Sequence, residues 1–357
     1  MTPTEPRPDV TPEDAPPGMP PEEVNAPDAL AEAGRIGTHA GQAESRDDAA
    51  DSQKAGANDP DSGGVDPAAL LAAPILFVTR FSFVGLSGWQ SDASRDAEKL
   101  FARERLLQRL ELFSTIALPS LAAQTDRDFH HLILTSDQLP AWAMEELTDS
   151  CVMCYGDSRQ FTIRAEPPGT TRRALRHYMQ RVYRDPVVVQ VVLDDDDGLA
   201  CDYVADLRRQ IATLAAPPQP PEEAARAGVA LPYFLSFPEG YGFSITEHAA
   251  DGLRERQEAS LYSHRYPFIN CGLAMLGTPD GKNIFAIDHR AAPRKYGARL
   301  FPGKAMFLRS IHEFNDSRVA VTEKWQPLES WREAEDIRTR FPWLLAREAL
   351  WNGAQGG

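Results

Sequence analysis

Four consecutive aspartates, Asp194–Asp197, are the residues whose type and spacing most directly suggest chemistry. They follow ValValValGlnValValLeu (187–193) without a spacer, and this β-branched run predicts a central strand that is buried on both faces. In a parallel α/β sheet, ligands bind at the carboxyl edge of the strands, which is where these aspartates would lie. Four carboxylates at one edge repel one another and raise each other's pKa unless a cation neutralises them. The run therefore predicts a cation site.

The Asp-x-Asp spacing indicates which kind of cation this would be. On an extended chain, residues two apart point to the same side, so two carboxylates can share one hard divalent ion that also holds phosphate oxygens. Two registers satisfy the spacing, Asp194 with Asp196 and Asp195 with Asp197. The alternative is a solvated acidic turn that caps the following helix, because Asp is favoured at helix starts.

The sequence lacks the glycine-rich motifs that hold phosphate groups in other classes of nucleotide-binding protein. The sequence has no GlyxGlyxxGly after a strand, no GlyxxxxGlyLysSer/Thr and no GlyxSerxGly elbow. A nucleotide-dependent enzyme of this pattern would hold the diphosphate through a metal and arginines.

Asp288 and His289 are candidates for a base that deprotonates an acceptor hydroxyl. They follow the strand-like IlePheAlaIle (284–287), and either group could accept the proton if it lay near the reacting carbon. A charged turn is the favoured alternative. A predicted helix at 170–183 and the residue after it carry five arginines: Arg172, Arg173, Arg176, Arg181 and Arg184. One of them could bind a pyrophosphate, although a solvated helix face is the favoured alternative.

The four cysteines, Cys151, Cys154, Cys201 and Cys271, agree with a reducing compartment. Cys151 and Cys154 have the spacing of a redox pair or of half a zinc site, but Cys201 and Cys271 stand alone in the sequence. We favour a strand at 150–155 with small packed thiols.

Apolar periodicity predicts alternating strands and helices from residue 71 onward. Helices are predicted at 96–118 and 170–183. Strands are predicted at 74–81, 131–137, 150–155, 187–193, 233–237 and 268–277, and a proline-rich surface loop at 217–223. Strands separated by helices imply βαβ units, so we expect an α/β fold with a Rossmann-type, mostly parallel mixed sheet that is flanked by helices.

Residues 1–70 differ in composition from the rest of the chain. They hold 15 of the 52 acidic residues, 4 of the 37 basic ones, 11 of the 29 prolines and no aromatic residue. Such a segment cannot bury enough apolar surface to offset the entropy lost on ordering, so we predict a disordered acidic arm. We expect one domain at 71–345 and a flexible C-terminal tail at 346–357.

Composition also argues against several classes of protein. No run of 18 apolar residues predicts a transmembrane segment, and MetThrProThrGluProArgProAspVal at the N-terminus lacks the pattern of a secretory signal. The chain has a net charge of -15, and residues 71–357 are near neutral, which disfavours nucleic acid as a partner. We expect a cytoplasmic protein, with peripheral contact to the inner membrane compatible with the sequence.

Several short stretches, in their order and spacing, resemble a known family. They are LeuPheValThrArgPheSer (76–82), Arg109 with Phe113, LeuProSerLeuAlaAlaGlnThrAspArgAspPhe (118–129), LeuAspAspAspAspGlyLeu (193–199) and IleHisGluPheAsnAspSer (311–317). Together they resemble the bacterial putative rhamnosyl transferase family, which are GT-A-like glycosyltransferases. The resemblance spans about residues 74–320 and implies a GT-A-like fold.

The resemblance also implies roles for individual residues. Nucleotide contacts would come from the end of the first strand and the start of the aspartate run: Thr79, Arg80, Phe81, Asp194 and Asp195. Ligands for Mn²⁺ or Mg²⁺ would be Asp194, Asp196, Asp197 and the late His312, for which a surface histidine at a helix end is an equal alternative. Neutral imidazole beside carboxylates suits manganese better than magnesium.

The implied activity is transfer of a sugar from a nucleoside-diphosphate sugar donor to a saccharide or other hydroxyl acceptor. The family name implies rhamnose as the sugar. Two alternatives from other classes are a metal-dependent nucleotidyl or phosphoryl transferase that uses the same aspartates, and a non-catalytic scaffold with a degenerate transferase domain.

Overall fold

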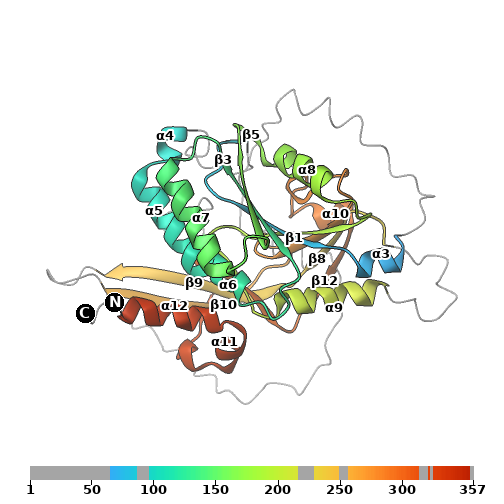
Figure 1. Cartoon of the computed structure of the whole chain (residues 1–357). Coiled ribbons are helices and arrows are strands. Elements are labelled where there is room, and N and C mark those ends of the chain that lie inside the picture. The colour runs from blue at the N-terminus through green and yellow to red at the C-terminus, as the bar shows by residue number, and fades with distance from the viewer. Residues whose placement is uncertain are drawn as a thin grey trace, which may run out of the picture. The chain divides into compact units, whose positions relative to one another are not determined.

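A computed structural model describes most of the chain after the acidic arm (Figure 1). The described residues are 65–86, 96–215, 229–248, 256–312, 321 and 325–353. Most of the predicted arm, the predicted loop at 217–223 and the end of the predicted tail lie outside them. Two of the segments expected to lack structure are partly helical: residues 67–70 of the arm belong to helix α3 (Pro67–Leu71), and residues 346–353 of the tail belong to helix α12 (Pro342–Gly353).

A seven-stranded mixed sheet forms the centre of the fold, as predicted. Its spatial order is β12-β8-β11-β6-β1-β3-β4, and only β11 runs against its neighbours. The strands are β1 (Ile75–Arg80), β3 (His130–Ser136), β4 (Phe161–Glu166), β6 (Val188–Val192), β8 (Tyr233–Ser236), β11 (Leu273–Gly277) and β12 (Gly297–Leu300).

The strand before the aspartates lies in the middle of this sheet. β6 pairs with β1 on one side, with Ile75 opposite Val189, and with β11 on the other. All five residues of β6 are buried, as expected for a β-branched run that is covered on both faces. The predictions for β1, β3, β6, β8 and β11 are therefore confirmed, although β11 is shorter than expected.

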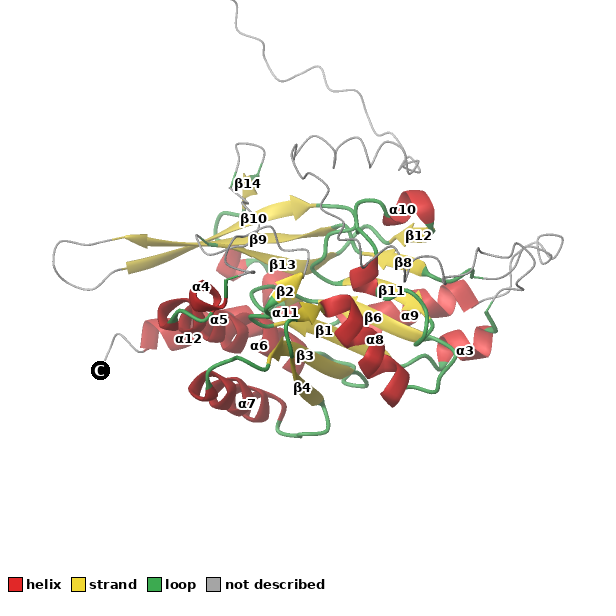
Figure 2. Ribbon diagram, turned by 90° about the horizontal axis from the view of Figure 1, so that it is seen from above, coloured by secondary structure: helices red, strands yellow, loops and turns green. Residues whose placement is uncertain are grey.

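Helices cover both faces of the main sheet (Figures 1 and 2). One face packs against α3 and against α5 (Arg103–Leu112), α6 (Leu118–Ala122), α7 (Ala141–Tyr155) and α9 (Tyr203–Ala215). The other face packs against α8 (Thr171–Val182), the 3-10 helix η4 (Ile284–Ala286) and α10 (Ala292–Lys295). The predicted helix at 170–183 is confirmed, whereas the strand-like 284–287 is largely the 3-10 helix.

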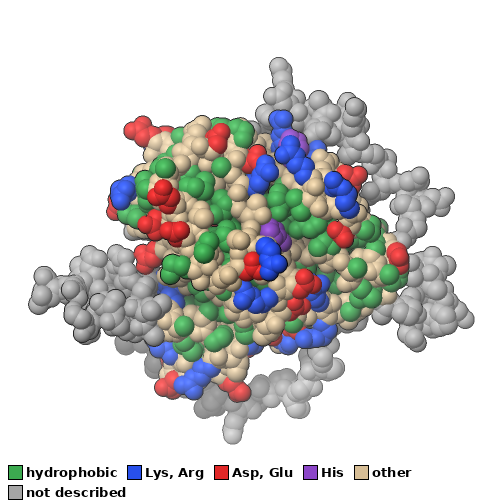
Figure 3. All heavy atoms as spheres, viewed as in Figure 1, with side chains coloured by type: hydrophobic (Ala, Val, Ile, Leu, Met, Phe, Trp, Pro, Cys, Tyr) green, Lys and Arg blue, Asp and Glu red, His purple; other side chains and the backbone are tan. Residues whose placement is uncertain are grey.

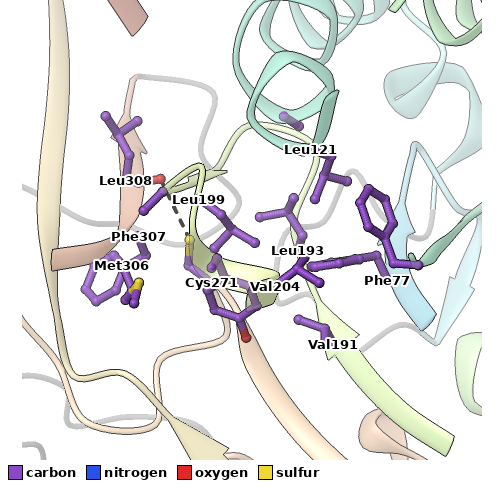
Figure 4. Packing of buried hydrophobic residues seen from close by; sticks show 14 of the residues in the cluster. Phe77, Leu121, Val191, Leu193, Leu199, Val204, Cys271, Met306, Phe307 and Leu308 are labelled. Carbon is purple, nitrogen blue, oxygen red and sulfur yellow. Dashed lines mark hydrogen bonds between the residues drawn. The ribbon is translucent and has the colours of Figure 1, made fainter. Parts of the chain in front are cut away.

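A second sheet, of five strands, packs against the first. Its order is β14-β10-β9-β13-β7, formed by β14 (Gln326–Pro327), β10 (Arg256–Arg265), β9 (Glu239–His248), β13 (Ala305–Ile311) and β7 (Gly198–Leu199). Figure 4 shows the shared core, a continuous cluster that extends from Phe77 and Val191 of the main sheet to Leu199 and Leu308 of the second sheet. Helices α11 (Glu335–Arg340) and α12 flank this region, and a small pair, β2 (Gly85–Leu86) with β5 (Gly169–Thr170), completes the strands.

The predicted strand at 150–155 is wrong, because these residues form the end of α7. Ala143, Leu147, Cys151 and Tyr155 are buried at intervals of four, which is the repeat of one helix face. Gly156 ends the helix in the left-handed conformation, with φ 67°. The strand beside β3 is β4 instead.

The predicted helix at 96–118 is divided into four segments. α4 (Ala97–Leu100) and α5 are followed by the π-helical segment η2 (Phe113–Ala117) and then by α6. Pro119 does not end the helix but lies in the first turn of α6, where its missing N–H costs little. The wider π turns precede this proline, and the Leu118 N–H bonds to the Phe113 carbonyl.

Candidate functional site

The aspartate run is the connection between the two sheets. β6 ends at Val192 and β7 begins at Gly198, so the four residues cross from the main sheet to the second sheet. They form a turn in which the Asp197 N–H donates to the Asp194 carbonyl at 3.3 Å. The assumption of an extended Asp-x-Asp chain is therefore wrong, and each carboxylate has its own surroundings.

Asp195 is held by a buried arginine. Arg109 of α5 donates from Nε to Oδ2 at 2.8 Å and from Nη2 to Oδ1 at 2.5 Å, which is a bidentate ion pair. The Asp195 side chain is 1 % exposed and the Arg109 side chain 7 %. Burial raises the pKa of Asp195 to about 7, although the charge of Arg109 opposes this shift. The carboxylate expected to contact a nucleotide is thus engaged by the protein.

Asp197 is engaged by the second sheet. Its Oδ1 accepts a hydrogen bond from the Ser310 backbone N–H of β13 at 3.1 Å. Burial and the neighbouring charges of Asp196 and Asp194 raise the pKa of Asp197 well above its usual value. Asp197, expected as a metal ligand, is therefore buried and has one carboxylate oxygen bonded to the second sheet.

Asp194 lies at the more open side of the turn. Its side chain is 28 % exposed, and its Oδ1 accepts a hydrogen bond from Nη2 of Arg80 at 3.0 Å. The guanidinium of Arg80 lies 5.0 Å from the centre of the Phe285 ring, which contributes a cation–π contact. Asp194 and Arg80, both expected at the site, are therefore in direct contact.

Asp196 pairs with the late histidine. His312 follows the end of β13, and its Nε2 lies 3.0 Å from Oδ2 of Asp196, although 116 residues separate the two. Burial opposes ionisation of Asp196, but the hydrogen bond and charge of His312 outweigh it, so the pKa of Asp196 is lowered. The expected position of His312 at the same sheet edge as the aspartates is confirmed.

The chain's own arginines offset part of the acidic charge, and His312 contacts a third aspartate. Arg80, Arg109 and His312 each contact one aspartate, so repulsion among the carboxylates does not by itself require a metal. Within the described ranges, no group of three or more His, Cys, Asp or Glu side chains gathers in an arrangement typical of a metal site. The sequence-based argument from charge alone is corrected on this point.

Two of the expected nucleotide contacts lie in the core. Thr79 is fully buried, and its Oγ1 lies 2.9 Å from Nε2 of the buried His131. Phe81 is fully buried too, and its ring centre lies 5.7 Å from that of Phe113. Neither side chain lines an open surface, so Arg80 is the member of this group that reaches the aspartates.

Of the two expected bases, His289 is the better placed. Its Nδ1 lies 3.8 Å from Oδ1 of Asp288, whose side chain is 65 % exposed. Burial lowers the pKa of His289 to about 4, and the charges of Arg309 and Asp194 also act on its ring. His289 is therefore uncharged at neutral pH. Asp288 caps the turn before α10 through its backbone carbonyl.

The Cys-x-x-Cys pair lies within a helix, and among the described residues it belongs to no group of three or more His, Cys, Asp or Glu side chains that could hold a metal. Cys151 and Cys154 are free thiols on α7. Burial raises the pKa of Cys151 to about 12 and that of Cys154 to about 11, which suppresses the reactive thiolate. The prediction that the thiols serve packing agrees with these surroundings, although the element is a helix.

A cavity of about 490 Å³ lies away from the aspartates, at the opposite end of β13 from His312. Its charged groups pair with one another: Lys304 and Arg340 each contact Asp202, and Arg340 also contacts Asp336. The lining residues are Asp202, Tyr241, Gly303, Lys304, Ala305, Asp336 and Arg340. Because these charges already pair, the cavity offers no binding chemistry comparable to that of the turn.

Sequence reasoning missed what Arg109 does. Arg109 entered only as one residue of the family resemblance, and its contact with Asp195 spans 86 positions. The side chains of Phe285 and Arg309 were missed altogether. The local sequence signal that could have identified this contact is an arginine on the apolar side of a helix. Arg109 lies between Leu106 and Leu110, which are both buried.

Comparison with known proteins gives one match over most of the chain. Residues 74–324 match the family described as "Putative rhamnosyl transferase". Among solved structures, the chain is similar to HddC from Yersinia pseudotuberculosis, with 11% identity and a TM-score of 0.31 over 66% of this chain and 93% of that one. That likeness is too weak to support any conclusion, and no curated protein matches. On the family match, the chain belongs to this family of glycosyltransferases.

Proposed function

We propose that the protein transfers a sugar from a nucleoside-diphosphate sugar to a hydroxyl acceptor, with Asp194 and Asp196 facing the diphosphate. One observation carries this proposal: the turn divides the four aspartates into two kinds. All four contact other parts of the protein, but Asp195 and Asp197 are buried, whereas Asp194 and Asp196 are 28 % and 16 % exposed. This division favours the Asp194–Asp196 register of the motif.

Asp194 and Asp196, the two partly exposed aspartates, fit a divalent cation. Their side chains are 28 % and 16 % exposed, whereas the other two carboxylates of the run are buried. Mg²⁺ is often bound by only one or two carboxylates, with phosphate oxygens and waters as its other ligands. His312, in contact with Asp196, adds a nitrogen donor that suits Mn²⁺. When bound, such an ion would neutralise charge on the diphosphate leaving group.

Other residues of the chain would act on the substrates directly. Arg80 holds Asp194 in place and presents a second cationic group to the diphosphate. His289 would accept the proton of the acceptor hydroxyl as that oxygen bonds to the sugar carbon and the bond from this carbon to the diphosphate breaks. The family name favours rhamnose as the sugar.

The test is turnover of Asp194→Asn and Asp196→Asn, measured as nucleoside diphosphate released from a panel of nucleoside-diphosphate sugars that includes rhamnose donors. We expect each variant to lose activity by about a hundredfold or more, while its melting temperature stays close to that of the wild type. Asp149→Asn is the matched control, because Asp149 is an exposed residue of α7, outside the proposed site, and should retain activity. Full activity in both variants would show that Asp194 and Asp196 are not needed for transfer and would refute their assignment to the diphosphate site.

Thermal shift separates this activity from nucleotidyl transfer. Stabilisation that needs both a nucleotide sugar and Mn²⁺ supports sugar transfer, whereas stabilisation by free triphosphates alone supports the other class. The structure favours the first, because two-metal catalysis needs more carboxylates on one side than Asp194 and Asp196 supply.

A further inference from the structure

The chain separates its charges strongly. Residues 170–185 and 280–299 carry ten Lys or Arg and three Asp or Glu. The other 321 residues carry 27 Lys or Arg and 49 Asp or Glu. A protein with a net charge of -15 therefore has two segments, more than ninety residues apart, that are both strongly basic.

The fold places these two segments on the same side of the molecule. α8 comes from the first segment, η4 and α10 come from the second, and all three pack on one face of the main sheet. The Asn283 side chain joins them, because its Nδ2 donates to the Arg172 carbonyl at 2.7 Å. The apolar residues of both segments, such as Leu175 and Ile284, face the sheet, so the charged residues face outward.

The outward side chains form a surface that we call the basic face. Figure 3 shows basic side chains gathered over α8. The exposed members of this face are Arg173, His177, Arg181 and Arg184 of the first segment, and Lys282, Arg290, Arg294, Lys295 and Arg299 of the second. Asp185, Asp280 and Asp288 are its acidic residues, so positive charge dominates the face.

We propose that the basic face docks the protein onto an anionic phospholipid surface. Clusters of four to eight Lys and Arg residues are attracted to anionic lipid headgroups. Each basic residue adds to the binding free energy, whatever the sequence around it. α8 lies flat on the sheet with its apolar side buried, so its arginines can meet a plane together but the helix cannot enter a nucleic-acid groove. Strong negative charge over the rest of the chain also repels an extended polyanion that would wrap around the protein.

Docking in this way would bring the aspartate turn close to the membrane. α8 begins directly after β5, which pairs with β2 beyond the carboxyl end of β1, so its first turn lies at the same sheet edge as the aspartates. The second segment reaches the site as well, through Phe285 against Arg80. Lipid binding itself does not depend on the proposed sugar transfer.

The test is co-sedimentation of the full chain with vesicles of phosphatidylcholine, with or without phosphatidylglycerol. We expect binding to the anionic vesicles only, and weaker binding at higher salt because the interaction is screened. Replacing Arg173, Arg181, Arg294 and Lys295 together with glutamine should weaken vesicle binding on the order of a hundredfold or more, at about fivefold per charge.

A matched control removes the same charge elsewhere. Lys99, Arg159, Arg265 and Arg338 are exposed basic residues outside the basic face, and their replacement by glutamine should leave vesicle binding unchanged. Unchanged melting temperatures would show that both variants fold. The proposal is overturned if anionic vesicles do not bind, if both variants lose binding equally, or if the basic face binds RNA or duplex DNA oligonucleotides but not vesicles.

Discussion

Replacing Arg109 with methionine tests the buried ion pair that supports the aspartate turn. Arg109 and Asp195 are 7 % and 1 % exposed, so removal of the arginine leaves a carboxyl that water does not reach. Breaking a buried pair by removing one partner typically costs about 3–5 kcal/mol. We expect Arg109→Met to lower the free energy of unfolding by this amount at pH 8, measured by urea denaturation.

The loss should depend on pH in a defined direction. Burial already raises the pKa of Asp195 to about 7 in the folded protein, from a usual value near 3.8, and Arg109 is the group that limits this rise. A folded pKa above the unfolded one means that stability is full below about pH 4 and falls as pH rises toward the folded pKa. In Arg109→Met the folded pKa rises further, so stability continues to fall above pH 7. The gap between the variant and the wild type should therefore widen between pH 7 and pH 9.

A double-mutant cycle separates the ion pair from the other contacts of Arg109. Replacing a buried pair with two apolar residues is often neutral, so Arg109→Met with Asp195→Leu should cost less than the two single changes added together. We expect a coupling energy of about 2 kcal/mol or more. A loss below about 1 kcal/mol in Arg109→Met, or strict additivity in the cycle, would refute the reasoning.

Three further outcomes can be checked on the same protein. Burial lowers the pKa of His131 to about 3, so below pH 6.5 the unfolded chain binds a proton that the folded chain does not. Between pH 6.5 and 5 the wild type should therefore lose about 1.6 kcal/mol more stability than His131→Gln, and equal losses would contradict this. The raised pKa values of Cys151 and Cys154 predict that iodoacetamide labels both thiols far more slowly in the native protein than in urea, followed by mass spectrometry. Deletion of residues 1–64 should leave the melting temperature unchanged, whereas Leu70→Ala, which removes a core side chain 2 % exposed, should cost about 2–5 kcal/mol.

The main sheet was predictable because its strands carry their own signal. β6 and β1 are short apolar runs next to clear breaks, and α8 shows apolar residues three and four apart. The second sheet carries no such signal. β9 contains Gly240 and Gly242, which weaken strand propensity, and a side chain at either position would collide with Phe307 or Trp325. Its strands depend on partners that are distant in the chain.

The candidate site was predictable in composition but not in geometry. The aspartates and His312 were identified by type and by resemblance, and the structure brings them together. Sequence could not show that Arg80 and Arg109 neutralise two of the acids, because those contacts join residues 114 and 86 positions apart. The sequence also could not show which aspartates are partly exposed and which are buried, because this depends on the turn and not on the alternation of a strand.

Because the turn contains four identical residues, its own side chains do not determine which aspartate faces Arg109 and which faces His312. The residues before and after the turn determine this. A slip of one position along the run would still offer an aspartate to Arg109 and another to His312, so the side chains themselves cannot select between the two alignments. The contacts that do distinguish them lie at the ends of the run, where Leu193 is buried in the core and Gly198 faces the Trp343 ring with no room for a side chain. Gly198→Ala should therefore act on the position of every aspartate at once, although it changes none of them.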